Sequence, residues 1–249
     1  MAKQDSILKI KGSLDGLTFY KSKDGYLVRK KGGVSRERIM TDMNFERTRE
    51  NIAEFGLTAQ SARLLRSSIG VLLHKAKDHR MSSRLFGVLS KVSKFDNVSA
   101  RGHRSVREGL LTPHGKALLK SFDFNRNAKF QSVFHAPYAL DTTTGVVTIP
   151  DFIGLDHLSI PQGATHVSLS TAFISLDFNS ETYDTQYSPV ENIALNMSAH
   201  TITLTPAAVP VGSGFKLYLL LIVFSQEVNG VQYSLSNDEF NVLHLLDVV

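Results

Sequence analysis

The chain of 249 residues contains neither cysteine nor tryptophan. The lack of cysteine excludes disulfide scaffolds, thiolate metal sites, iron–sulfur clusters and cysteine nucleophiles together. Long apolar runs are also lacking, because the longest, at 217–224, is far short of the roughly 20 residues that a membrane span needs. No apolar signal core follows the first residues. We therefore expect a protein of the cytoplasm or of an assembled particle, without signal peptide or transmembrane segment.

Positive charge is almost missing from the second half of the chain. From residue 130 onward Lys216 is the one Lys or Arg, against 11 Asp and Glu, a balance of −10. Residues 1–129 hold 27 Lys and Arg against 12 Asp and Glu, a balance of +15. So abrupt a change predicts two regions with different surfaces that meet near residues 121–131. We expect a basic β-meander and helical region over 1–129 and an acidic β-sandwich domain over 130–249.

The basic region opens with three short runs that favour β-structure, at 7–11, 17–20 and 26–29. Asp15-Gly16 precedes the second run and Asp24-Gly25 precedes the third. Asp-Gly pairs supply the positive φ angles of tight hairpin turns. The pattern predicts a three-stranded antiparallel meander.

A helical hairpin is expected next, with its turn at 79–83 and its second helix over 85–95. Asp42 or Asn44 is the expected N-cap of the first helix, and a third, shorter helix is expected over 115–121. The first helix is predicted from apolar residues at helical spacing, which we expect to form its buried stripe: Ile52, Phe55, Ala59, Ala62, Leu65, Ile69, Leu72 and Ala76.

The acidic region reads as strand throughout. The run at 217–224 is apolar at every position, as in a central strand buried on both faces. Asn229-Gly230 is a strong hairpin signal, and the apolar parity change after Phe173 predicts a β-bulge or a strand that switches sheets. Residues 240–249 are expected to form a last strand. Short alternating strands are predicted at 147–149, 167–171, 202–204 and 231–235. The fold class is therefore α+β, with an antiparallel, immunoglobulin-like sandwich as its second part.

No motif for catalysis or cofactor binding stands out. Residues 109–117 resemble a phosphate-binding loop, but five residues separate the glycines where four are required, and Ala117 stands where a Ser or Thr should bind magnesium. The nine histidines are scattered without metal-ligand spacing. We expect no enzyme activity, no catalytic residue, no metal and no cofactor.

The cations form clusters that are candidates for binding an anion or a partner. Arginine and lysine at this density create a field that attracts anions, and nucleic acid is the usual anion. The acidic half of a neighbouring subunit is the other anion available. The candidate residues are Arg29, Lys30, Lys31, Arg36 and Arg38 in the first cluster, Arg63 and Arg66 in the second, and Arg101, Arg104 and Arg107 in the third. The second cluster also contains Lys75, Lys77, Arg80 and Arg84.

Several segments resemble a family of uncharacterised proteins from the Bacteroidota. They are LTFYKSKDGYLVRKKGGV at 17–34, FERTREN at 45–51, EFG at 54–56, ARLLR at 62–66 and QEVNG at 226–230. The similarity extends over most of the chain and is most specific in its first 70 residues. It implies the two-part architecture and assigns no site residue or activity.

Three hypotheses follow. The first is a non-enzymatic structural protein whose copies assemble head to tail, basic face against acidic face, into a filament, a ring or a virion-like assembly. Strand addition at the edges of 6–11 and 240–249 is a second expected route of association. The alternatives are a nucleic-acid-associated protein that binds through its basic half, and a sandwich that binds a ligand or carbohydrate.

Overall fold

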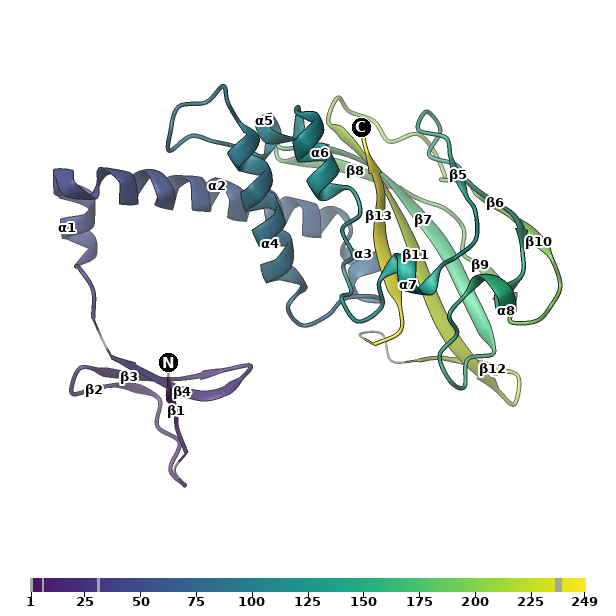
Figure 1. Cartoon of the computed structure of the whole chain (residues 1–249), viewed down its shortest axis with the longest axis horizontal. Coiled ribbons are helices and arrows are strands. Elements are labelled where there is room, and N and C mark those ends of the chain that lie inside the picture. Colours follow the sequence, from purple (N-terminus) through teal and green to yellow (C-terminus); the bar gives the residue numbers. More distant parts are fainter. Residues whose placement is uncertain (1, 6, 31, 236–238) are drawn as a thin grey trace. The chain divides into compact units, whose positions relative to one another are not determined.

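The computed structural model of the chain describes residues 2–5, 7–30, 32–235 and 239–249. It divides into two compact units, which we term unit 1 (Met1–Glu50) and unit 2 (Asn51–Val249). Helices and antiparallel sheets are both present (Figure 1), which confirms the predicted α+β class. None of the helices in the described ranges combines the length and hydropathy that a bilayer crossing requires.

Unit 1 contains a four-stranded antiparallel sheet. Two of the three expected meander strands, those at 17–20 and 26–29, are present and are joined by a tight turn. Asp15 and Gly16 have φ angles of 46° and 74°, the left-handed pair that a type I′ hairpin requires. The strand order is β1-β4-β3-β2, with β1 at Ala2–Lys3, β2 at Gly12–Leu14, β3 at Leu17–Ser22 and β4 at Gly25–Lys30.

The expected first strand at 7–11 is wrong, and the meander begins instead at Gly12. The side chain of Gln4 donates to the carbonyl of Ile10 (3.2 Å) and accepts from its backbone N–H (3.1 Å). These bonds hold the segment as a loop, because they use the backbone groups of Ile10 that a β-ladder would pair. Ile7 and Leu8 are exposed within it. The edge strand expected over 6–11 is therefore absent from residues 7–11; Ser6 lies outside the described residues.

A helical stretch leads from unit 1 into unit 2. Helix α1 (Arg36–Thr41) is followed by the 3-10 turn η1 (Met43–Phe45) and by helix α2 (Glu46–Ser68). Asp42 is a cap as expected, but of η1, where its side chain accepts from the backbone N–H of Asn44.

The buried stripe of α2 is shorter than predicted. Ile52 and Phe55 are 53% and 61% exposed, so their assignment to the core is wrong. Burial begins at Thr58 and Ala62. The helix ends at Ser68, and the chain continues as α3 (Gly70–Leu73). Helical spacing predicts which side chains share one face of the helix. It does not predict how much of that face other elements cover.

Three further helices follow in the basic part of unit 2. The second helix of the expected hairpin is present as α4, but it packs mainly against α5 and α6 instead of along α2, so the two helices do not form the expected hairpin. Gly109 of α5 permits close packing, because a Cβ there would lie 2.1 Å from the carbonyl oxygen of Val92. The bounds are Met81–Val92 for α4, Ser93–Phe95 for the turn η2, Val106–Leu110 for α5, and Pro113–Leu119 for α6, which matches the helix expected over 115–121.

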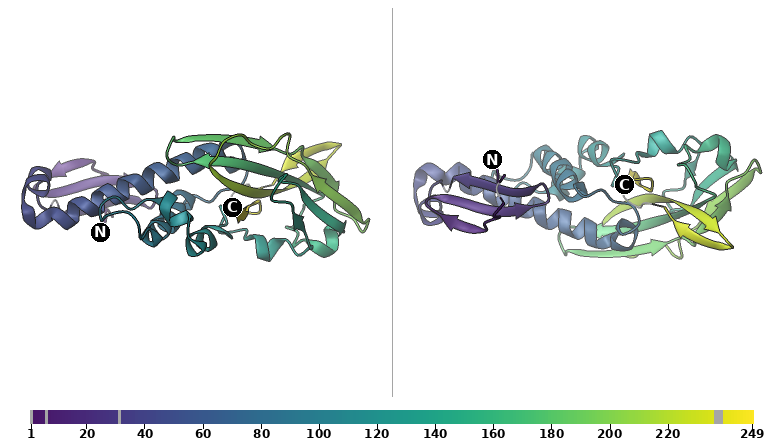
Figure 2. Two further views of the ribbon diagram at one scale, coloured as in Figure 1. Left: turned by 90° about the horizontal axis from the view of Figure 1, so that it is seen from above. Right: turned by 90° about the horizontal axis from the view of Figure 1, so that it is seen from below.

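The rest of unit 2 contains two antiparallel sheets and two single-turn helices, α7 (Phe130–Val133) and α8 (Gly154–His157). In the large sheet β11 pairs with β7, β12 and β13, and β7 also pairs with β8 and β9 (Figures 1 and 2). Its strands are β7 (His166–Asp177), β8 (Thr182–Tyr187), β9 (Glu191–Ala194), β11 (Phe215–Val228), β12 (Val231–Ser234) and β13 (Val242–Val248). The small sheet has β5 (Ala139–Leu140), β6 (Val147–Phe152) and β10 (His200–Leu204).

The central strands are predicted well except in one respect. The run at 217–224 lies in β11 and is buried on both faces nearly throughout, and Asn229-Gly230 forms the predicted turn to β12. The bulge or sheet switch expected after Phe173 is wrong, because β7 pairs with β11 in unbroken register from His166 to Leu176. Both faces of β7 are covered, so apolar residues occupy both parities without any break in the strand.

Two buried clusters hold unit 2 together, one on each face of the large sheet. The first joins Leu219 of β11 with Leu65 and Leu85 of the helices. The second joins Leu220 of β11 with Ile149 of the small sheet. Since the helices of the basic region and the sheets of the acidic region share a core, the compact units divide at Glu50/Asn51, and the charge boundary at 129/130 lies inside unit 2.

The outer edge of β13 is not open for strand addition, contrary to expectation. The backbone of residues 121–124 bonds along it: Ser121 donates to Leu245, Leu245 donates to Phe122, and Phe124 donates to Leu243. This segment acts as the missing neighbour of the edge strand.

Candidate functional site

The sheet of unit 1 has one apolar face. Side chains of a strand alternate between faces, and directly paired residues share a face. The pairs Leu14–Leu17 and Phe19–Val28 therefore lie on the same side of the sheet. Lys21 pairs with Tyr26 on that side as well. We term this surface the apolar face of unit 1; its members are Leu14, Leu17, Phe19, Tyr26 and Val28.

No described residue of unit 1 forms a second layer that buries the apolar face, although Phe19, Tyr26 and Val28 are half-buried. Among the described residues of unit 1 none is buried, and Leu14 and Leu17 are 61% and 39% exposed. A sheet with a hydrophobic face is stable when that face packs against another layer. Unit 1 therefore presents a surface suited to a partner.

Lysines surround the apolar face. Lys9 and Lys21 place their Nζ atoms 5.9 and 5.7 Å from the centre of the Tyr26 ring. Lys30 pairs with Leu17 at the end of the sheet and is exposed. Unit 1 as a whole has 12 Lys and Arg against 7 Asp and Glu. The apolar face thus favours a partner that is apolar at its centre and acidic around it.

The first predicted cation cluster is divided between surfaces. Arg29 lies on the face opposite Lys30, with its guanidinium 5.6 Å from the centre of the Tyr20 ring. Arg36 and Arg38 belong to α1, and Arg38 forms an ion pair with Asp42 at 3.3 Å. Lys31 lies outside the described residues.

The other two predicted clusters do not form one site. Arg107 lies beside residues 57, 60, 61 and 64 of α2 in a shared hollow, and it forms an ion pair with Glu108. At 100° per residue, Arg63 and Arg66 point away from that side of α2. Arg101 is exposed, and Arg104 is half-buried, with its Nε atom unbonded. The structure therefore separates Arg63 and Arg66 from Arg107.

Unit 2 carries no net formal charge but is divided internally. Residues 51–129 hold 15 Lys and Arg against 5 Asp and Glu, and residues 130–249 carry the balance of −10. At the end of β7 and the start of β8, a hollow of about 330 Å³ combines Asp177 and Asp184 with Tyr183 and Val211. We term it the acidic hollow. Tyr183 and Val211 are 46% and 76% exposed, so it is apolar as well as acidic.

The carboxylates of the acidic hollow are held in place by hydrogen bonds. The backbone N–H of Asn179 and the hydroxyl of Ser180 donate to Asp177, and these bonds lower the pKa of its carboxyl group. Asp184 accepts from the backbone N–H of Val211 at 2.7 Å. Two cations lie near these carboxylates: Arg107 lowers the pKa of Asp177 further, and Lys216, which donates to the carbonyl of Gly212 at 3.1 Å, lies near Asp184. The negative charge of the acidic hollow is therefore partly offset within unit 2.

A second charged hollow of about 470 Å³ lies on the helical part of unit 2, between α4 and residues 118–129. Sequence reasoning missed it as a site. Arg126 and Lys129 lie three residues apart after the helices, and Arg84 and Lys91 lie seven apart on α4, a spacing that could have indicated one face. We term it the basic groove; it combines Arg84, Lys91, Arg126 and Lys129 with Val88, Leu118 and Phe122.

A buried ion pair supports the basic groove from beneath. The side chain of Asp78, 1% exposed, binds the Arg84 guanidinium and the backbone N–H groups of Arg80 and Arg126. Burial raises the pKa of Asp78, but the bonds from Arg84, Arg126 and Arg80 together outweigh it, so the net pKa is lowered. Arg84 also donates to the carbonyls of Asp123 and Phe124. This network joins α4 to the segment that carries Arg126.

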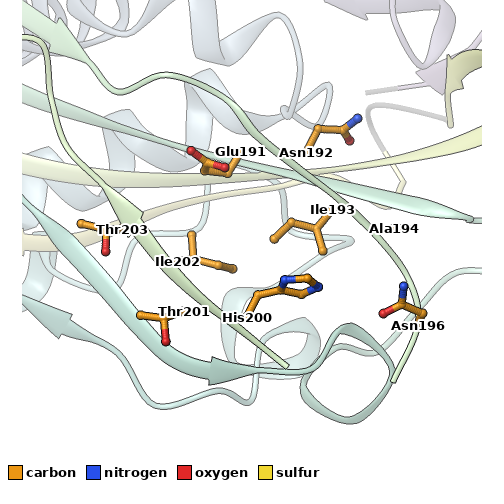
Figure 3. A pocket seen from close by; sticks show the side chains of 9 residues that line it. All are labelled: Glu191, Asn192, Ile193, Ala194, Asn196, His200, Thr201, Ile202 and Thr203. Carbon is orange, nitrogen blue, oxygen red and sulfur yellow. The ribbon is translucent and has the colours of Figure 1, made fainter. Parts of the chain in front are cut away.

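A third hollow, of about 530 Å³, lies between β9 of the large sheet and β10 of the small sheet. Figure 3 shows the side chains of Ile193, His200 and Ile202 between the two strands, with Asn196 at one end. No Phe, Tyr or Trp is among its described lining residues.

No protein-family model, curated protein or solved structure matches this chain.

Proposed function

We propose that this protein is a non-enzymatic structural component whose copies assemble head to tail. Unit 1 of one copy docks, through its apolar face, on the acidic β-region of the next copy. The observation that carries the proposal is the sheet of unit 1, which has an apolar face and no buried residue among those described.

Charge favours a second copy as the occupant of this face. Two apolar faces packed against each other would bring Lys21 and Lys30 toward their own counterparts, a repulsive arrangement. Residues 130–249 offer the complementary balance of −10. The acidic hollow combines this charge with exposed Tyr183 and Val211, so it fits a partner that is apolar and ringed by lysines.

The form of the assembly follows from the unlike surfaces. A contact between two different patches is heterologous, and it gives a ring when its rotation closes and a filament when it does not. Apolar burial would supply most of the affinity, while the charges would set the encounter rate and the register. A virion-like assembly is one such closed form.

The test uses two neighbouring residues on opposite faces of β3. Phe19→Asp places a carboxylate on the apolar face, and Thr18→Asp places the same charge on the other face. Light scattering on full-length protein at rising concentration should show oligomers for the native chain and for Thr18→Asp, and monomers for Phe19→Asp. Lys30→Glu, an exposed change on the apolar face, should weaken association and leave the fold intact. A native chain that stays monomeric in low salt at high concentration contradicts the proposal.

The immunoglobulin-like character of the sandwich is also a proposal. It is supported by the cluster of buried residues between the large sheet and β6 and β10, which has the two-layer character of a sandwich. A crystal structure would decide whether the two sheets pack face to face as in an immunoglobulin domain.

A further inference from the structure

We propose that the basic groove of unit 2 binds the sugar–phosphate backbone of single-stranded nucleic acid. The groove differs from the ten candidate residues that the sequence singles out, and it plays no part in the proposed assembly contact.

The charges of the groove are unbalanced. Four cations line it with one acid, Asp123. The carboxylate of Asp123 is oriented by two contacts, since its Oδ1 atom accepts from the backbone N–H of Phe130 at 3.1 Å and lies 2.7 Å from Nδ1 of His244. Arg84 is balanced by Asp78. The other three cations and Asp123 together leave a formal balance of +2.

Those three cations are available to a ligand. Lys91, Arg126 and Lys129 are exposed, and within the described part of the chain their side chains form no ion pair or hydrogen bond. They come from two elements, α4 and the segment after Phe124. Like charges held close together repel one another, and a polyanion that bridges them relieves this repulsion while releasing its own counterions.

The floor of the groove indicates a nucleotide rather than a small anion. The apolar part of its lining consists of Val88, Leu118 and the buried Phe122. The Arg84 guanidinium lies over the Phe122 ring, 5.2 Å from its centre, and is 27% exposed. A guanidinium plane held in this way is a stacking surface for an unpaired base. Its bonds to Asp78 and to two carbonyls fix the orientation of that plane.

The experiment measures binding of a fluorescein-labelled oligothymidine of about 15 nucleotides to the full-length protein by fluorescence anisotropy, at salt concentrations between about 50 and 200 mM. Arg126→Glu with Lys129→Glu should raise Kd at least about tenfold and lower the slope of log Kd against log salt by about 1.4, since each phosphate contact on a single strand contributes about 0.7. The milder Lys91→Gln should raise Kd about threefold with a smaller loss of slope.

Arg63→Glu with Arg66→Glu is the matched control. It makes the same change in net charge on α2, outside the groove, and should leave the salt slope unchanged. Circular dichroism on all variants separates loss of binding from loss of fold.

Three results would overturn the proposal. The first is no binding by the native chain at about 50 mM salt, where counterion release helps most. The second is an equal loss of oligonucleotide affinity in both double variants, which would mean that binding depends on the overall positive charge and not on the groove. The third is loss of self-association, with oligonucleotide binding retained, in Arg126→Glu with Lys129→Glu, which would assign the groove to an acidic protein surface. Phe19→Asp should keep full oligonucleotide binding, so that failure of assembly and failure of this site are separable.

Discussion

The two units both contain antiparallel sheets with apolar and polar faces, but only the sheet of unit 2 is covered. In unit 2, β7 and β11 carry buried residues on both sides, with helices on one face and the small sheet on the other. In unit 1 the same alternation leaves Leu14 and Leu17 exposed. An alternating sequence therefore determines that a face is apolar, while the presence of a second layer decides whether that face stabilises the chain or awaits a partner.

The two units also differ in net charge: the charges of unit 2 are balanced within it, and those of unit 1 are not. Unit 2 is neutral overall, because its basic helices and acidic strands share one core. Unit 1 keeps an excess of five cations. A surface that is apolar and of one sign is poorly suited to remain alone in water and well suited to a complementary partner.

The largest expected effect comes from the core of unit 2. Leu85 of α4 is fully buried, so Leu85→Ala should lower the free energy of unfolding of unit 2 by about 2–5 kcal/mol. Leu17→Ala, the same substitution on the apolar face of unit 1, should lower it by less than about 0.5 kcal/mol in the monomer. Urea unfolding at low protein concentration compares the two. Equal losses would mean that unit 1 shares in the core of unit 2.

The next effect tests how the helices are joined to the segment after them. Arg84→Met leaves the carboxylate of Asp78 buried without its guanidinium and should cost about 3 kcal/mol, the low end for a broken buried pair, because Arg84 is partly exposed. Arg38→Met removes an ion pair of unit 1 with a 65% exposed arginine and should cost at most about 1 kcal/mol. The comparison again uses urea unfolding.

The pH dependence of unfolding tests the contribution of the buried Asp78 carboxylate to the stability of unit 2. The pKa of Asp78 is lowered in the folded protein, so its ionised form stabilises unit 2 above the ordinary value of 3.8, and this stabilisation is lost as the pH falls through the lowered pKa. Asp78→Asn should cost about 1.5–3 kcal/mol at pH 7, the range for bonds to a charged group. The difference from the native chain should shrink toward pH 3. Thermal unfolding between pH 7 and pH 3 measures it, and a constant difference would contradict the assignment.

Local signals predicted the elements of this fold better than their partners. Asp15-Gly16 and Asn229-Gly230 form their turns because positive φ angles are encoded in the residues themselves. The strand expected at 7–11 fails because the Gln4 side chain captures the backbone of Ile10. The alternation of apolar and polar residues does not encode this side-chain competition, even though it acts over only six residues.

Sequence patterns were also insufficient to predict which cations lie together in the folded chain. Arg29 and Lys30 are neighbours in sequence, yet the pleat sends them to opposite faces of the sheet. Arg126 and Lys129 lie far from Arg84 and Lys91 in sequence, yet the ion pair of Arg84 with Asp78 brings the two segments together. Charge density along the chain predicted a basic region, but folding decided which cations converge.

The smallest effect is expected from removing the sheet of unit 1. Deletion of residues 1–34 takes away β1 to β4 and leaves α1, whose N-cap Ser35 remains. Because no buried residue is lost with the described part of this segment, the midpoint of urea unfolding of unit 2 should stay within experimental error. Light scattering on the same sample should show only monomers, since the apolar face has gone. Lys30→Glu in the full chain is the milder control, with partial loss of assembly and the same midpoint. A deletion that unfolds unit 2 would mean that unit 1 is part of its stability, and the exposed face would then need a covering layer within the chain instead of a second copy.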